Sequence, residues 1–217
     1  MADAAVNLHT QEAPEQDLWN GGPDVSPYKV GSKKFGMWLF ILSDALTFSA
    51  VIMAYAYIRL STPEWPQPFN ADSILTASIM TFLLLSSSIT MVMAVNAAQR
   101  GLRTRAALWI GATMLGGLGF LVLHANEWRH LIVERHMLPT SNPWGTPMFG
   151  GTFFALTGMH MLHVTIGVIY LCFVATGFRW GKFDAEDVEV SGLYWHFVDL
   201  VWMFIFPLVY LMSTRIV

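Results

Sequence analysis

The stretch GLYWHFVDLVWMFIFPLVYLM, residues 192–212, decides the fold class. It is almost entirely apolar, and about 20 such residues are what a helix needs to cross the hydrocarbon core of a bilayer. It nevertheless carries His196 and Asp199, which are one helical turn apart. An ionisable side chain at membrane depth is costly unless it faces protein or trapped water and finds a partner. These two residues therefore point to function or to helix packing inside the membrane.

The composition is that of an integral membrane protein. Hydrophobic residues make up 54% of the 217 residues and charged residues only 12%, which is too apolar for one water-facing globule of this size. The net charge of −3 argues against a nucleic-acid-binding surface. The single cysteine, Cys172, lies in an apolar stretch, so neither a disulfide framework nor a cysteine-based metal site is expected.

The sequence predicts an all-α fold with five membrane-spanning helices. Backbone polar groups cannot face lipid unpaired, and these segments are too long and continuous for barrel strands. Residues 1–34 are polar and acidic and form a predicted N-terminal tail, whereas residues 35–217 form the predicted transmembrane domain. The five predicted helices are Phe35 to Leu60, Ile74 to Ala98, Ala106 to Asn126, Phe149 to Phe178 and Leu193 to Met212.

Lysine and arginine are distributed unevenly between the two ends of these helices. Eight of them fall in the tail and in the connections after the second and fourth predicted helices, against four elsewhere. Since cytoplasmic loops carry the excess of these residues, the amino terminus is expected in the cytoplasm and the carboxyl terminus outside. The plasma membrane of a bacterium, or an equivalent respiratory membrane, is the expected location.

Ionisable residues recur inside the predicted spans. Helical rise places Asp44, His160, His163, His196 and Asp199 together in the middle-to-inner half of the bundle. A lone carboxylate at this depth needs a partner, so Asp44 is expected to hydrogen-bond His160 or His163. His124 and Glu127, at the end of the third predicted helix, are expected at the outer surface, with Glu127 as a solvated rim residue.

Other interpretations of these residues stay open. An intramembrane Asp–His pair can hold helices in register without taking part in chemistry. His160 and His163 share one helix face and could bind a metal with His196, or either could bind haem with His196. No cysteine accompanies them to select a metal, and we expect no metal or haem in this chain. A proton-conducting carrier, with Asp44 and the histidines as a relay, is a further alternative.

Four stretches resemble the signature segments of subunit III of haem-copper cytochrome c oxidases. They are GMWLFILSD (36–44), LHANEW (123–128), GTFFALTGMHMLHVTIG (151–167) and YWHFVDLVW (194–202). The resemblance runs in order from about Phe35 to the end of the chain. Asp44 matches the position of the family's carbodiimide-reactive intramembrane carboxylate, which is often glutamate.

The resemblance implies a subunit without redox or catalytic residues of its own. Haem and copper would be held by partner subunits, with the catalytic subunit I and subunit II as neighbours and phospholipid bound between them. Contacts with lipid or with a partner are expected at Trp38, His196, Asp199 and Trp202. The chain departs from the seven-helix form of the family: it lacks the first two helices, has Asp at 44, and has a short connection from Arg179 to Val190 without histidine.

The expected function is that of a five-helix accessory subunit of a cytochrome c oxidase, a proton-translocating oxidoreductase of aerobic respiration and electron transport. It would stabilise the catalytic subunit, bind lipid and support proton uptake. The equivalent subunit of a quinol oxidase or nitric oxide reductase is the near alternative, because the electron donor and acceptor sites would lie on other subunits.

Overall fold

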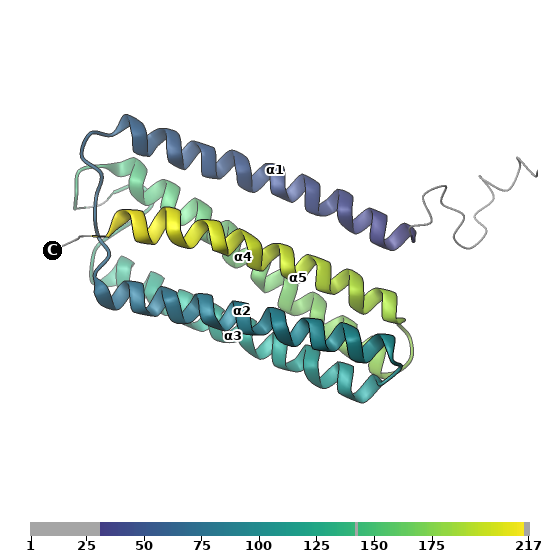
Figure 1. Cartoon of the computed structure of the whole chain (residues 1–217). Coiled ribbons are helices and arrows are strands. Elements are labelled where there is room, and N and C mark those ends of the chain that lie inside the picture. Colours follow the sequence, from purple (N-terminus) through teal and green to yellow (C-terminus); the bar gives the residue numbers. More distant parts are fainter. Residues whose placement is uncertain (1–30, 142, 215–217) are drawn as a thin grey trace, which may run out of the picture.

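Five long α-helices form the molecule (Figure 1) in the part of the chain that the structure, a computed structural model, describes, residues 31–141 and 143–214. Each is long and apolar enough to cross a membrane by length and composition, which confirms the predicted all-helical, polytopic architecture. Their bounds are α1 Ser32–Ser61, α2 Ala71–Gln99, α3 Arg103–Val133, α4 Pro147–Arg179 and α5 Ala185–Ile205. A π-helical turn η1, Phe206–Tyr210, and a 3-10 turn η2, Leu211–Ser213, continue α5.

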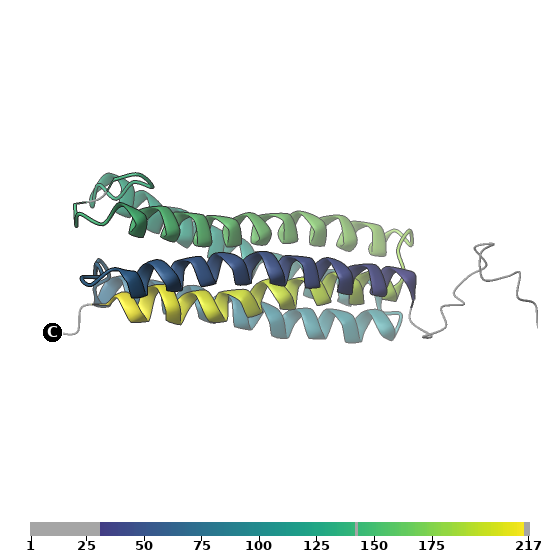
Figure 2. The same cartoon turned by 90° about the horizontal axis from the view of Figure 1, so that it is seen from above.

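Helices α2 to α5 form a four-helix core, and α1 packs on one side of it. α2 contacts α3 and α5, and α4 contacts the same two helices, whereas α1 packs mainly against α4 and α5. In Figures 1 and 2 the helices run side by side along the full length of the molecule, with short connections at both ends. α1 buries only Ile41, Phe48 and Tyr55, so most of its surface is left for lipid or another protein.

The connections have local causes in the sequence. Pro63, Pro66 and Pro68 end α1 and keep the segment to α2 extended. Gly101 and Gly181 follow the ends of α2 and α4 with φ of 74° and 75°, a left-handed conformation that glycine adopts without a Cβ penalty and that commonly ends a helix.

Two predicted helix boundaries are wrong. α3 continues to Val133, and so includes Glu127, because Leu131 continues its buried face. α5 begins at Ala185 instead of near Leu193, because the side chains of Asp184 and Asp187 form a capping box that satisfies the free N–H groups of its first turn. The predicted polar tail, 1–34, mostly lies outside the described residues, and its last three residues belong to α1.

The end of α5 deviates from α-helical geometry at Pro207. Proline has no N–H to donate to the helical ladder, and a π turn accommodates the missing bond. This turn and η2 bury Val209, Tyr210 and Ser213. Ser213 accepts a hydrogen bond from Trp65 Nε1 at 3.1 Å, and Tyr55 Oη donates one to the carbonyl oxygen of Leu208 at 3.1 Å. The carboxyl end of the described chain is thereby fixed to α1 and to the loop after it.

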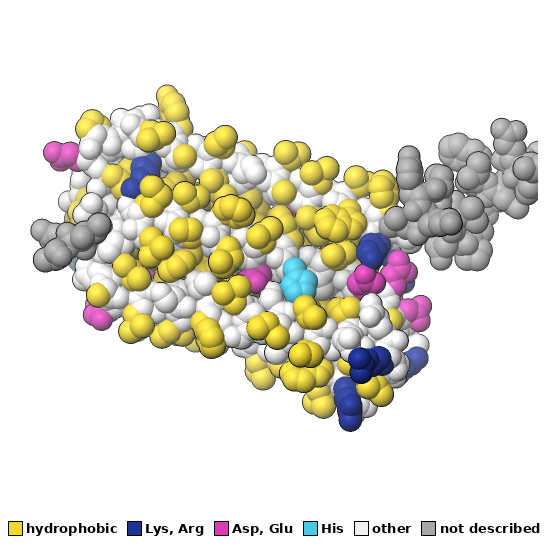
Figure 3. Space-filling model, viewed as in Figure 1, with side chains coloured by type: hydrophobic (Ala, Val, Ile, Leu, Met, Phe, Trp, Pro, Cys, Tyr) yellow, Lys and Arg dark blue, Asp and Glu magenta, His cyan; other side chains and the backbone are white. Residues whose placement is uncertain are grey.

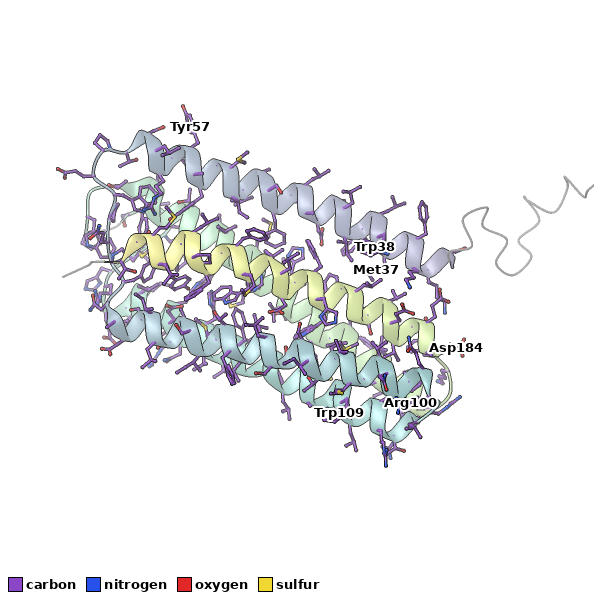
Figure 4. All side chains as sticks on the ribbon, viewed as in Figure 1. Met37, Trp38, Tyr57, Arg100, Trp109 and Asp184 are labelled. Carbon is purple, nitrogen blue, oxygen red and sulfur yellow. The ribbon has the colours of Figure 1, made fainter. Side chains whose placement is uncertain are left out.

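The surface has the pattern of a membrane protein. Hydrophobic side chains cover the length of the bundle in Figure 3, and most charged side chains gather near its ends. Figure 4 places Met37, Trp38, Arg100, Trp109 and Asp184 at one end and Tyr57 toward the other. At the first end, Lys33 and Lys34 of α1 pair with Asp187 and Glu189 of α5, with N–O distances of 2.7 and 2.5 Å.

Candidate functional site

Asp44 and His163 meet between α1 and α4. The Asp44 Oδ2 and His163 Nε2 atoms lie 3.3 Å apart, and each side chain is only 16% exposed. The Nδ1 atom of His163 lies 2.7 Å from the carbonyl oxygen of Met159. Phe48 packs on the imidazole edge at a centroid distance of 5.0 Å. The structure thus places Asp44 against one of the two histidines that the sequence offered, His163.

The contact to Met159 orients the imidazole ring of His163. A carbonyl oxygen can only accept a hydrogen bond, so Nδ1 of His163 carries a proton. Asp44 Oδ2 lies 3.3 Å from Nε2 of the same ring but has no hydrogen-bond partner among the described residues. The predicted hydrogen bond is therefore a close approach of the two side chains.

His160 lies in a different cluster, so the predicted grouping of Asp44, His160 and His163 is wrong. Residues three apart on an α-helix point about 60° apart around its axis, which turns His160 into the core. Its ring is fully buried, stacks on Trp202 at a centroid distance of 5.2 Å, and meets the edge of Phe120 at 5.5 Å. It contributes to a buried aromatic cluster instead of pairing with Asp44.

His124 and Glu127 belong to this same buried cluster, so their predicted place on the outer surface is wrong. His124 is fully buried and Glu127 is 7% exposed. Tyr210 of η1 donates a hydrogen bond to Glu127 Oε2 at 2.7 Å, and His124 Nδ1 lies 3.9 Å from the same oxygen. The extension of α3 past Asn126 and the inward turn of η1 bring these groups together.

His196 and Asp199 form a third polar group, with Ser88 of α2. Ser88 Oγ donates to Asp199 Oδ2 at 2.8 Å and lies 3.0 Å from His196 Nδ1. Since the single hydroxyl proton is used toward Asp199, the His196 Nδ1–H donates to Ser88. The ring of His196 also lines a mostly apolar groove of about 260 Å³ between α2 and α5, with Val92, Asn96 and Gly192 among its other lining residues.

The two tryptophans predicted to contact lipid or a partner have different surroundings. Trp38 is 52% exposed on α1 and lies near the charged end of that helix (Figure 4), in a position open to lipid or a neighbour. Trp202 is fully buried and donates from Nε1 to Thr81 Oγ1 at 2.9 Å. The prediction for Trp202 is wrong, because hydropathy gives its depth in the membrane but not the direction in which it faces.

Metal-binding geometry does not occur within residues 31–141 and 143–214. No three His, Cys, Asp or Glu side chains of this part converge closely enough to hold an ion. His196 bonds to Ser88, whereas His160 and His163 lie in separate clusters. What the polar groups offer instead is hydrogen bonding between helices and proton binding.

Comparison with known proteins identifies this arrangement. The family model described as cytochrome c oxidase subunit III matches residues 25–214, nearly the whole chain. The chain belongs to the cytochrome c oxidase subunit III family. This confirms the resemblance seen in the four signature stretches.

Relatives of two kinds are similar to this subunit III along most of its length. Cytochrome bo(3) ubiquinol oxidase subunit 3 of Pseudomonas aeruginosa is 31% identical, with 99% of this chain and all of the relative covered. Cytochrome c oxidase subunit 3 of Bacillus sp. strain PS3 is also 31% identical, covering 95% of this chain and 99% of the relative. Quinol oxidase subunit 3 of Bacillus subtilis is 34% identical over 82% of this chain and 86% of the relative.

The polar partners within this subunit III include two that sequence reasoning missed. They are Ser88, a small residue of α2, and Tyr210, which lies within the last predicted apolar span. Ser88 lies 108 and 111 residues before its partners, and Tyr210 lies 83 residues after Glu127. No local pattern marks contacts across such separations. The helix-breaking Pro207, three residues before Tyr210, is the one available hint that this hydroxyl turns inward.

Proposed function

We propose that this chain is a non-redox accessory subunit III of a haem-copper cytochrome c oxidase that works in aerobic respiration. The match to the subunit III family over residues 25–214 carries the proposal. The polar clusters of the described residues support it, because their contacts suit helix packing and proton binding and none has metal-binding geometry. Haem and copper would lie in the partner subunits, which supply the electron-transfer chemistry.

The partners would be the catalytic subunit I and subunit II. A wide apolar surface supports this role: α1 and the outward faces of the other helices expose large side chains such as Leu46, Met53, Phe82 and Leu115. Such a bundle would shield the flank of the catalytic subunit and hold phospholipid against it. It would thereby keep proton uptake into the catalytic subunit ordered.

Each end of the bundle would lie on a defined side of the membrane. The arginine and lysine excess supports an orientation with the amino terminus in the cytoplasm and the carboxyl terminus outside, in a bacterial plasma membrane or an equivalent respiratory membrane. The residues before α1 would be a polar cytoplasmic tail of the transmembrane domain. Single cysteines placed in the tail and after Met212 should react with an impermeant reagent from opposite faces of the membrane. Labelling of both from one face would reject this orientation.

An affinity tag on this chain tests its assignment to an oxidase. The tagged chain should co-purify with a haem- and copper-containing subunit from detergent-solubilised membranes. Recovery of the folded chain without haem protein, under conditions that preserve oxidase activity in the membranes, would overturn the proposal.

The same preparation identifies the electron donor. Relatives named as cytochrome c oxidase and quinol oxidase subunits match at 31–34% identity, so the donor is a property of the partners. Oxygen consumption with reduced cytochrome c is the expected result. Activity with a quinol alone would assign the chain to the quinol oxidase branch.

A further inference from the structure

The most polar part of the interior is the cluster between α3, α4 and η1. Its members are His124, Glu127, Trp128, His160 and Tyr210. Six buried polar atoms here have no hydrogen-bonding group of the described residues in reach: both ring nitrogens of each histidine, Glu127 Oε1 and Trp128 Nε1. They are six of the eight such atoms in this part of the chain, so the unmet hydrogen-bonding capacity is concentrated in one place.

Unmet polar atoms in such number require a bound partner. Leaving a buried donor or acceptor without a hydrogen bond is costly, and six together would remove a large part of the folding free energy of a domain. Buried water is the usual partner and makes about three hydrogen bonds per molecule. Two water molecules, at about three hydrogen bonds each, would match the six atoms in number.

A polar pocket borders the cluster at Glu127. It has a volume of about 180 Å³ and is lined by Asp72, Ser73 and Thr76 of α2 and by Asn126, Glu127 and His130 of α3. Several water molecules fit in a polar space of this size. Glu127 lines the pocket and also faces the interior cluster through its bond to Tyr210, so it connects the two.

Glu127 has no cation to balance a negative charge. The only ion-pair contact of Glu127 among the described residues is His124 Nδ1, at 3.9 Å and outside hydrogen-bonding distance. The other titratable groups near the site are His160 on α4, Tyr210 on η1, and Asp72 and His130 at the pocket rim, where His130 pairs with Glu134 at 2.9 Å. An isolated buried carboxylate is neutralised by binding a proton.

We propose that Glu127, His124 and His160 form a hydrated proton-binding site that fills with water through the pocket between α2 and α3. Glu127 carries one exchangeable proton, Tyr210 holds its Oε2 atom, and water links its Oε1 atom to the two imidazole rings. The ligands of this site are water and a proton. The inference does not depend on the accessory role or on the orientation of the bundle.

Infrared difference spectroscopy tests directly whether the Glu127 carboxyl group carries a proton. The sample is whatever assembly the tagged chain co-purifies with, compared in H2O and D2O. We expect the stretching band of a protonated carboxyl group, shifted to lower wavenumber in D2O. Glu127→Gln should remove this band, whereas Glu134→Gln, a change at a rim residue whose side chain is 62% exposed, should leave it. A spectrum without a band that depends on Glu127 would overturn the proposal.

The water is tested by a second variant and by direct imaging. His160→Phe keeps a ring stacked on Trp202 but deletes both ring nitrogens, so it should shift the Glu127 band without removing it. A band that His160→Phe leaves unmoved would contradict the water link. A map of the wild-type assembly at a resolution that shows water should contain ordered water bonded to Glu127 Oε1 and to the histidine rings. A dry cluster in that map would overturn the proposal even if Glu127→Gln fails to fold.

Discussion

Gly117 of α3 is a position where one methyl group should weaken the whole bundle. A Cβ added there would lie 2.5 Å from Cη2 of Trp195 and 2.9 Å from Cγ2 of Val168, both closer than van der Waals contact. The indole cannot easily move away, because it is buried and its Nε1 donates to Ser87 Oγ at 3.0 Å. The substitution Gly117→Ala therefore forces either α5 or α4 away from α3.

The magnitude follows from two opposing effects. Overpacking a well-packed core costs roughly 1–3 kcal/mol, and replacing glycine by alanine in a helix returns about 0.5–1 kcal/mol. Gly111→Ala in the same helix provides the matched control, since a Cβ at Gly111 meets no atom within 4 Å. The helix-propensity gain is common to both variants and cancels. Gly117→Ala should therefore be less stable than Gly111→Ala by roughly 1–3 kcal/mol.

The assay is the free energy of unfolding of the purified protein in detergent, followed by circular dichroism as denaturant is added. Helix content of the two variants under native conditions should be equal, which separates a packing defect from a failure to form α3. Equal unfolding free energies for Gly117→Ala and Gly111→Ala would refute the close approach of α3, α4 and α5 described above.

Two further predictions concern α1. A hydrophobic carbodiimide should modify Asp44 slowly, because its side chain is only 16% exposed and lies inside a span. Mass spectrometry should find an adduct that is lost in Asp44→Asn, and an adduct confined to exposed carboxyls would contradict the intramembrane pair. Replacing both Lys33 and Lys34 by glutamine should lower the unfolding free energy by up to about 1 kcal/mol per ion pair. That loss should shrink at high salt, whereas Lys182→Gln, at a residue that lies over the Trp180 ring, should show no such salt effect.

The helices could be predicted from the sequence, but which side of each helix faces the interior of the bundle could not. Hydropathy over about 20 residues reports a span directly, and each of the five predicted spans is a helix in the structure, although α3 ends later and α5 begins earlier than predicted. Buried polar residues, such as those at the end of α3, are harder to predict. Glu127 was expected to be a solvated rim residue because it follows the end of an apolar window, whereas Tyr210 and the turn at Pro207 create the buried site that holds it.

The polar residues inside the spans show the same limit. Helical rise gave the depths of Asp44, His160 and His163, and one of the two possible partners of Asp44 lies against it. The choice between the histidines depends on a rotation of about 60° around α4, which is set by contacts with other helices. The Ser88–His196–Asp199 group likewise depends on how α2 and α5 pack. Neither can be obtained from the sequence of one helix.

We propose that this chain protects a proton-pumping partner without taking part in electron transfer. Removing the subunit from the purified oxidase and following turnover is the measurement that tests it most directly. Initial electron transfer and the haem spectrum should stay largely intact, while proton uptake at high pH slows and the enzyme loses activity sooner during turnover. Immediate loss of the haem–copper spectrum or of all activity would contradict the account, and so would an unchanged turnover lifetime and pH dependence.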